Sequence, residues 1–250
     1  MSHAPGAGHP EYPDPPDALD AAADDDLGET ADDADDAAEP ARPPSDRTRV
    51  RRLPKRGHYD RATIDAILDA AIVGHVAWVQ DGQPFATPTA VWRQGDRLYW
   101  HGSSASRMLR TTDGFPVCVT VTLLDGLVLA RSGFNHSVNF RSVMALGTAH
   151  LVTDDAEAEQ ALKAFIDHLY PGRWPELRPM SPKERKATSV LWMDLNEASA
   201  KVRADINHDD DDEQWPTWGG VIPVRMVQDA PEPDAFVAPG TPAPEARLPG

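Results

Sequence analysis

Apolar and polar residues alternate along the middle of the chain, which is the pattern of strands with one buried face. The run His75–Gln80 is followed by Asp81-Gly82 and then by Pro84–Trp92. A two-residue Asp-Gly turn between such runs is a strong hairpin signal. Further runs of this kind are Arg97–His101, Val117–Thr122, Gly126–Arg131 and Arg141–Thr153. Six short strands in series predict a closed or split antiparallel barrel.

A helical pattern precedes these strands. Within Asp60–Val73 the apolar residues fall at helical spacing, and they are Ile64, Ile67, Leu68, Ala71 and Ile72. Asp60 or Thr63 is the expected N-terminal cap, and Gly74 is the expected end of the helix.

A second amphipathic helix, Asp154–Leu169, follows the strands and begins with acidic residues. A Pro-rich connection over residues 174–186 comes next. Ser189–Leu195 and Ala200–Arg203 then predict one more strand or a strand pair. The fold class expected from the pattern is mainly β with flanking helices.

Composition divides the chain into one folded domain and two tails. Residues 1–50 are rich in Pro, Ala, Gly and Asp and contain almost no large apolar residues, so we expect this tail to be disordered. The Pro-rich residues 229–250 are expected to be disordered as well. Residues 51–228 are the expected folded domain, in which residues 208–213 read as an acidic loop.

The net charge of −16 belongs to the tails. Residues 1–46 hold 14 acidic residues and one basic residue, whereas residues 47–228 hold 22 of each. A neutral domain with acidic tails does not predict nucleic-acid binding, which needs a basic face. The basic cluster ahead of the first helix is either a nucleic-acid or membrane patch or a solvated arm, and the nearby acid favours the arm. Its members are Arg47, Arg49, Arg51, Arg52, Lys55 and Arg56.

Cysteine and apolar content restrict the setting of the protein. Cys118 is the single cysteine, so no intramolecular disulfide framework is possible. No apolar run approaches the length that spans a membrane, and the first residues lack the apolar centre of a signal peptide. We therefore expect a cytoplasmic protein with no membrane partner. No two histidines have the spacing of a metal site, so no metal is predicted.

A polar turn follows the strand that ends at His101. It reads Gly-Ser-Ser-Ala-Ser and leads into a short predicted helix, Ser106–Thr112, with Arg107 and Arg110 in its first turns. One interpretation is ordinary capping by serine beside solvated arginines. The other is an anion site, because free backbone N–H groups and a guanidinium both suit phosphate. The residues alone leave both interpretations open.

Two histidines lie where they could contact a ligand, His101 at this turn and His136 in the segment NHSVNFRS. Each is either a contact or proton-transfer group or a histidine that is satisfied by the backbone. His75 and His150 lie within predicted strands and are interpreted as structural. No nucleophile–base–acid triad is legible.

The order of the elements and four strings resemble the pyridoxamine 5′-phosphate oxidase-like family of FMN-binding split barrels, and within it the Nim-type and flavin-nucleotide-binding branch. The strings are GHVAWVQDGQPFATPTAVWRQGDRLYWHGSSASR, LARSGFNHSVNFRSVMALGTAHLV, SAKVR and WGGVIPV. The resemblance covers Arg56 to about Val227. It implies an antiparallel split β-barrel that forms a homodimer, with FMN in a groove between the subunits.

Carried over by position, the resemblance assigns two groups of residues to the cofactor. In the first group, the residues beside the flavin ring are Thr87, Pro88, Thr89, Ala90 and Val91. The residues near the ribityl chain are Trp100, His101 and Gly102, and those at the phosphate are Ser106 and Arg107. The second reaches the cofactor across the dimer or from the C-terminal side and comprises Asn139, Arg141, Ser142 and Trp218.

The function implied is an FMN-dependent oxidoreductase that exchanges electrons with a small organic substrate, with NAD(P)H as a candidate donor. The flavin supplies the redox chemistry, so no catalytic residue is identified. The alternatives are a flavin-binding carrier or sensor without turnover, and the same barrel using haem or a deazaflavin. Oxidation of B6 phosphates is not predicted. The oxidases proper carry an arginine-rich site near the C-terminus, where this chain has only Arg203 and Arg225.

Overall fold

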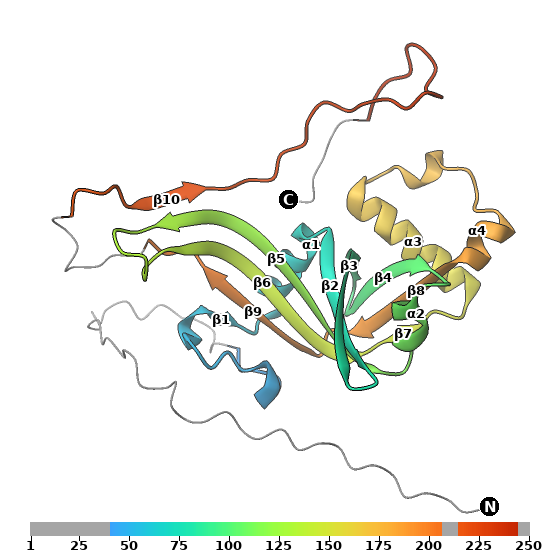
Figure 1. The fold of residues 1–250 in the computed structure, drawn as a ribbon. Coiled ribbons are helices and arrows are strands. Elements are labelled where there is room, and N and C mark those ends of the chain that lie inside the picture. The colour runs from blue at the N-terminus through green and yellow to red at the C-terminus, as the bar shows by residue number, and fades with distance from the viewer. Residues whose placement is uncertain (1–40, 207–214, 245–250) are drawn as a thin grey trace, which may run out of the picture. The chain divides into compact units, whose positions relative to one another are not determined.

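The structure, a computed structural model, describes residues 41–206 and 215–244. Within these residues ten strands form one antiparallel sheet in the order β1-β9-β6-β5-β2-β3-β4-β8-β7, with β10 also paired to β5 (Figure 1). The strands are β1 (Gly57–His58), β2 (Val73–Gln80), β3 (Gln83–Gln94), β4 (Arg97–Ser103), β5 (Pro116–Leu129), β6 (Ser137–Thr148), β7 (His150–Leu151), β8 (Thr188–Asp194), β9 (Glu197–Arg203) and β10 (Gly220–Pro223).

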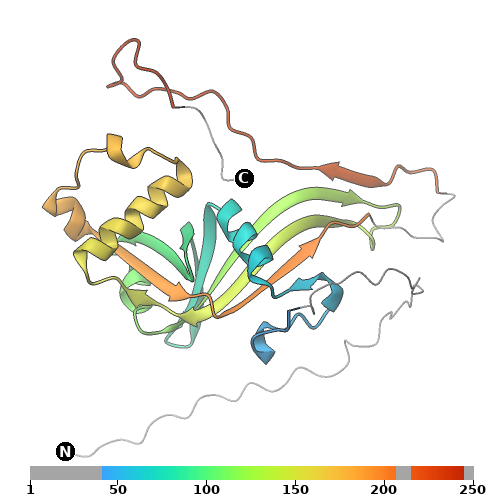
Figure 2. The same cartoon turned by 180° about the vertical axis from the view of Figure 1, so that it is seen from behind.

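The helices cover separate parts of this sheet. Helix α1 packs against β3, β6 and β9, and Figure 2 shows it in front of the strands, whereas α3 packs against β3 and β8. The helices are α1 (Arg61–Ala70), α2 (Arg107–Thr111), α3 (Asp155–Leu169) and α4 (Pro182–Ala187), with short 3-10 turns at Asp46–Thr48, Pro54–Arg56 and Trp174–Glu176. None of the described helices is long and apolar enough to cross a membrane.

The sheet curls without closing. In the described residues the end strands β1 and β7 each pair with one neighbour, β9 and β8, and not with each other. The prediction of a mainly β protein with an antiparallel split barrel is therefore confirmed.

Two apolar clusters hold the sheet and helices together. The larger one joins the apolar face of α1, including Ile64, Ile67 and Leu68, to inward-facing strand residues such as Val76 and Trp100. The smaller one lies under α3 and contains Trp92, Tyr99, Ala161, Leu162 and Val190. Because strand residues alternate between faces, neighbouring residues of β4 serve different clusters.

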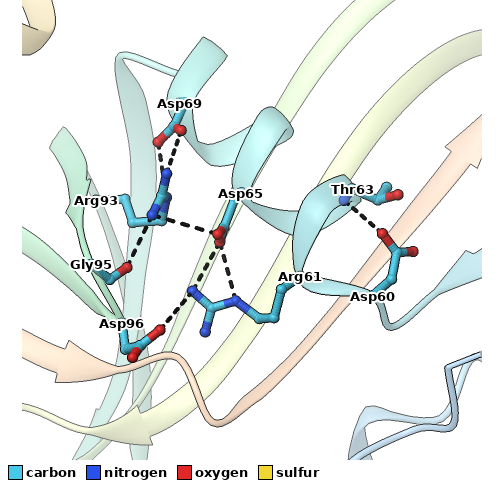
Figure 3. A network of polar contacts seen from close by, with 8 residues as sticks. All are labelled: Asp60, Arg61, Thr63, Asp65, Asp69, Arg93, Gly95 and Asp96. Atoms are coloured by element: carbon cyan, nitrogen blue, oxygen red, sulfur yellow. Dashed lines mark hydrogen bonds and ion pairs between the residues drawn. The ribbon is translucent and has the colours of Figure 1, made fainter.

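A polar network fixes α1 to the β3–β4 hairpin (Figure 3). Arg93 of β3 donates from Nε to Oδ1 of Asp69 at 2.9 Å and from Nη2 to Oδ2 at 2.5 Å, and it also pairs with Asp65 at 3.5 Å. The charge-assisted bond to Asp69 raises the pKa of Arg93. Asp60 caps α1 by accepting a hydrogen bond from the backbone of Thr63 at 2.7 Å, as predicted.

Two local predictions were wrong. Residues 117–122 and 126–131 were expected to form two strands, but β5 runs through, with a register shift between Leu124 and Gly126 in place of a turn. Gly74 does not end α1, because the helix stops at Ala70 and Gly74 lies in β2, where a Cβ would come within 3.0 Å of Val91. The Pro-rich segment over residues 174–186 does connect α3 to β8, and it includes the 3-10 turn Trp174–Glu176 and most of α4.

The segment before β1 packs on the sheet. Thr48 is 1% exposed, and the backbone N–H of Val50 donates to Oη of Tyr59 at 2.8 Å. Ordered contacts therefore begin upstream of residue 51. Residues 229–244 are exposed and form neither helix nor strand. The acidic loop predicted at 208–213 and the first forty residues lie outside the described part of the chain.

Candidate functional site

Strand β3 changes partner at Val91. Its first part, Gln83–Ala90, pairs with β2, and its second part, Val91–Gln94, pairs with β4. The last paired residue of β4 is Trp100, after which β4 continues beside β8 alone. The two strands therefore diverge, and the first part of β3 has one open edge.

The direction of the backbone groups on this edge follows from the hairpin. Asp81 and Gly82 have φ of 52° and 75°, as in a two-residue hairpin turn, and the N–H of Val91 donates to the Ile72 carbonyl at 3.1 Å. Since alternate residues of an antiparallel strand bond to opposite sides, the even-numbered residues from 84 to 90 face the open edge. Pro84 and Pro88 carry no N–H, so the donors on this edge are Ala86 and Ala90.

The opposite wall of the opening is the end of β4 and the turn into α2. Thr89 Oγ1 donates to the His101 carbonyl at 3.3 Å, close to the point of divergence. The N–H of Ser106 donates to the Ser103 carbonyl at 2.8 Å, which closes the turn. Gly102 permits close packing here, because a Cβ would lie 3.0 Å from Cδ1 of Leu109 in α2.

Arg107 brings a positive charge to this opening. Its side chain is exposed, and its guanidinium carbon lies 4.1 Å from the centre of the Phe85 ring on β3. Ser106 is the N-cap residue of α2, but its side chain makes no capping hydrogen bond, so the hydroxyl is not engaged at the helix start. Arg110 is used locally, since its Nε donates to the Ser104 carbonyl at 3.0 Å.

Trp100 and His101 point away from each other. Trp100 is fully buried in the larger cluster, and its indole N–H has no hydrogen-bond partner in the described residues. The His101 ring lies against Trp92 and Phe165, with centroids 5.6 Å and 4.7 Å away, and its buried Nδ1 has no partner there. Burial lowers the pKa of His101 below its usual value.

The second predicted group does not meet the first within one chain. Asn139 is buried and accepts a hydrogen bond from Arg203 at 2.7 Å, Arg141 pairs with Asp125 at 2.9 Å, and the Ser142 hydroxyl lies 3.3 Å from the Lys201 carbonyl. These residues lie on β6, separated from β3 by β5 and β2. Trp218 is 60% exposed beside β10.

The structure therefore brings Thr87–Val91, the backbone of Trp100–Gly102 and Ser106–Arg107 together where β3 and β4 diverge, whereas the side chains of Trp100 and His101 pack against buried apolar residues. With these residues in place, comparison with known proteins identifies the family. The family model described as pyridoxamine 5′-phosphate oxidase matches residues 60–202. This chain belongs to that family. A comparison with curated proteins gives no match.

Several solved structures are similar to this chain. The flavocytochrome Anf3 from Azotobacter vinelandii is 47% identical with a TM-score of 0.78, covering 83% of this chain and all of that one. The FAD and haem binding protein from Mycobacterium smegmatis is 38% identical with a TM-score of 0.72, covering 76% and 94%. A 5-nitroimidazole resistance-type protein from Bacteroides thetaiotaomicron VPI-5482 is 23% identical with a TM-score of 0.48, covering 58% and 86%.

The structure shows local contacts for the other histidine candidates. His136 contacts the Ser132 carbonyl through Nδ1 at 2.8 Å, and the His150 ring lies 4.7 Å from Trp192. Half-burial raises the pKa of the Cys118 thiol, which does not suit a nucleophile. Among the described residues no group of three or more His, Cys, Asp and Glu side chains could hold a metal ion.

The sequence analysis did not predict which face of its strand His75 occupies. The interpretation of His75 as structural rests only on its place within a predicted strand. In the structure it is exposed on the face of β2 opposite to Val76 and Trp78. The available signal was the alternation itself, which places His75 on the outward side whenever Val76 and Trp78 are inside.

Proposed function

We propose that this chain is a flavin- and haem-binding redox protein of the flavocytochrome type. The observation that carries the flavin part is the open edge of β3, which faces the diverging end of β4 and has Arg107 beside it. The likeness to the A. vinelandii flavocytochrome, over that chain's whole length, supports the haem part.

The residues at the opening have the chemistry that a flavin requires. The ring of a flavin carries acceptors and a donor along one side, and an open strand edge offers N–H donors alternating with carbonyls. Ala86 and Ala90 are the donors available for this contact. Arg107 would bind the phosphate, because a guanidinium forms strong, paired hydrogen bonds to phosphate oxygens. Ser106, with its hydroxyl not engaged in capping, would support that contact.

The flavin is proposed to be FAD rather than the FMN expected from sequence. The M. smegmatis relative is described as binding FAD and haem. FMN and FAD share the ring, the ribityl chain and the first phosphate, so the assignment of Thr87–Val91 and Arg107 is the same for both. The two differ only in the adenylate group beyond that phosphate.

The second predicted group is proposed to act from a partner subunit. Asn139, Arg141, Ser142 and Trp218 lie too many strands from the opening to reach it in the same chain. A homodimer would bring one subunit's β6 and β10 to the other's β3. Arg141 is partly exposed although it is paired with Asp125, so it remains accessible for such a contact.

We propose that the bound cofactors exchange electrons with a small organic molecule. NAD(P)H is the candidate electron donor. When bound, the flavin supplies two-electron chemistry and the haem supplies one-electron chemistry. The chain's own residues bind and orient these groups. His101 is not proposed as a proton donor, because its ring is packed under α3.

The test is the cofactor content of the purified full-length protein. We expect a flavin spectrum, release of FAD on denaturation as identified by mass, a haem Soret band, and reduction of both by NADPH or NADH without air. Release of FMN alone would overturn the assignment of FAD. Absence of haem after growth with added haem precursor would overturn the flavocytochrome assignment. If neither NADH nor NADPH reduces the bound cofactors, the protein would be a carrier or sensor and not an enzyme.

A further inference from the structure

The outer face of the sheet carries one exposed imidazole. His75 stands on β2 between Pro88 of β3 and Thr120 of β5, its direct partners in register. Apart from Thr120, the neighbouring side chains on this face are small or apolar, and they include Val73, Ala77, Val79, Ala86, Pro88 and Cys118. The imidazole therefore projects from a surface of short side chains with few polar groups, and we call this surface the platform.

The His75 ring is free of partners within residues 41–206 and 215–244. No hydrogen bond, ion pair or ring contact joins it to any described residue. Four other described histidines are held by neighbours: His101 and His150 by aromatic rings, and His136 and His168 by backbone carbonyls. Either nitrogen of His75 is thus available to a ligand outside the chain.

Basic side chains border the platform. A cavity of about 490 Å³ on the same face is lined by Thr120 and Thr122 of β5 and by Arg49, Arg51, Arg52 and Lys201. Thr120 is the register neighbour of His75, and neighbouring strands lie about 4.8 Å apart. Arg49 and Arg51 pair with exposed Asp46, whereas the Arg52 guanidinium has no partner among the described residues.

A cleft of about 770 Å³ lies on the other side of the platform. It is apolar where it meets the platform, at Ala77, Val79 and Cys118, and its far end is polar and is lined by Arg47, Asp194, Asn196 and Glu197. Val79 is 63% exposed and Phe115 is 59% exposed. Large apolar side chains left open to water mark a surface that another molecule covers.

A free imidazole, an apolar platform and a group of cations at one border match the three parts of a haem: iron, macrocycle and propionates. Imidazole is a usual axial ligand of haem iron. We propose that His75 is an axial ligand of the haem iron, with the macrocycle on the outer face of β2 and β5 and the propionates toward Arg49, Arg51 and Arg52. This rests on the proposed function, since it names the residues that would hold its haem.

The position also suits the flavin proposal. His75 is the register partner of Pro88, which lies on the open edge of β3 between Ala86 and Ala90. The proposed iron ligand is therefore one strand away from the proposed flavin edge. This arrangement would place the two cofactors on adjoining surfaces of a single chain.

The test compares haem binding by the full-length wild type, His75→Ala and His150→Ala. Haem-free protein is titrated with hemin, and absorption and electron paramagnetic resonance spectra are recorded. We expect His75→Ala to bind hemin at least about tenfold more weakly, to lose the signature of histidine ligation, and to recover it when imidazole is added. His150→Ala, a histidine at the border of the same cleft, should match the wild type.

Two further measurements keep the outcomes separate. His75→Met should bind haem with a shifted spectrum, and flavin binding in each variant reports whether the fold is intact. Wild-type spectra in His75→Ala, or loss of ligation in His150→Ala alone, would overturn the assignment of His75 while leaving the flavocytochrome proposal in place. A wild type that takes up no haem would overturn that proposal itself.

Discussion

Arg107 is the residue on which the phosphate assignment depends. It is an exposed guanidinium held over an aromatic ring, next to a serine hydroxyl that is not used in capping. Neither contact compensates its charge, so the side chain can turn to an anion at little cost. Arg110 differs because it already bonds a carbonyl of the turn.

Replacing Arg107 with Ala should weaken binding of FAD and FMN by roughly ten- to a hundredfold, since a hydrogen bond to a charged group contributes about 1.5–3 kcal/mol. Riboflavin, which lacks the phosphate, should bind both proteins alike. Fluorescence quenching titrations measure this. Arg110→Ala is the control, with a smaller expected loss. Equal FAD affinity in the wild type and Arg107→Ala would remove this residue from the site.

His101 should make stability depend on pH. Its pKa is lowered in the folded state, so the unfolded chain binds the proton more readily. Its contribution is fully present above the unfolded value of about 6.5 and is lost as the pH falls below it. We expect the free energy of unfolding to fall less steeply from pH 7 to pH 5 in His101→Phe than in the wild type. Urea titrations at several pH values decide this, and parallel curves would contradict it.

At the scale of elements, two kinds of contact attach α1 to the sheet: its apolar face packs in the core, and a polar contact joins it to β3. The link is Arg93, which is mostly buried and reaches two carboxylates of the helix as well as the Gly95 carbonyl at 3.0 Å. Arg61 belongs to the same network but is more exposed. Substitution of Arg93 therefore tests a partly buried ion pair, and substitution of Arg61 tests a more exposed one.

Arg93→Ala should lower the free energy of unfolding by about 1–2 kcal/mol, which is the value for a charged hydrogen bond reduced for partial exposure to water. Arg61→Ala, the matched control, should cost less than about 0.5 kcal/mol. The measurement is the urea midpoint at constant slope. An equal loss in both variants would mean that the network acts only through surface charge.

The elements that sequence predicted correctly are those with local signals. Asp81-Gly82 sets a hairpin, and the period of Ile64, Ile67 and Leu68 sets α1, because turn chemistry and periodicity need no distant partner. The error at Leu124 to Gly126 has the opposite origin. A bulge and a turn use similar residues, and only pairing with β6 shows that β5 continues.

The site was predictable only in part, because its shape also depends on strands that are distant in the sequence. The residues of the opening came from a family resemblance, whereas the opening itself exists because Val91 switches partners, and that depends on where β4 runs. The residues alone could not decide between capping and anion binding at Ser106. The exposure of His75 was not predicted, because membership of a strand does not by itself say which face meets water.

On the scale of the whole molecule, the folded part is expected to include the segment from Ser45, whose backbone and side chain bond Thr48. A chain of residues 41–228 should unfold as cooperatively as the full protein. A chain that begins at residue 51, the boundary expected from composition, should be less stable by roughly 1–2 kcal/mol, because it loses buried Thr48 and the bond to Tyr59. Thermal unfolding of both fragments measures this, and equal stability would restore the boundary at 51.

The cofactor-bound protein is predicted to be a homodimer. The far part of β5, with β6 and β10, leaves Leu127, Val138 and Ile222 exposed side by side, as on a surface that a second copy covers. Light scattering should give twice the mass of one chain, and Leu127→Asp should shift the protein toward the monomer, while Gln94→Asp, an exposed site elsewhere, should not. A cofactor-bound wild type that runs as a monomer would contradict the assignment of Asn139, Arg141 and Ser142 to a partner.

The two prolines on the open edge of β3 also bear on how the chain avoids aggregation before any cofactor binds. A strand edge with a full row of donors and acceptors invites an identical strand from another chain, and fibrils grow this way. Pro84 and Pro88 remove every second donor from that row, so an incoming strand cannot complete its ladder. A small molecule needs only one or two of the remaining groups. The same edge can therefore bind a ligand although it pairs poorly with another strand. This property would protect newly made protein from aggregation until its cofactor binds.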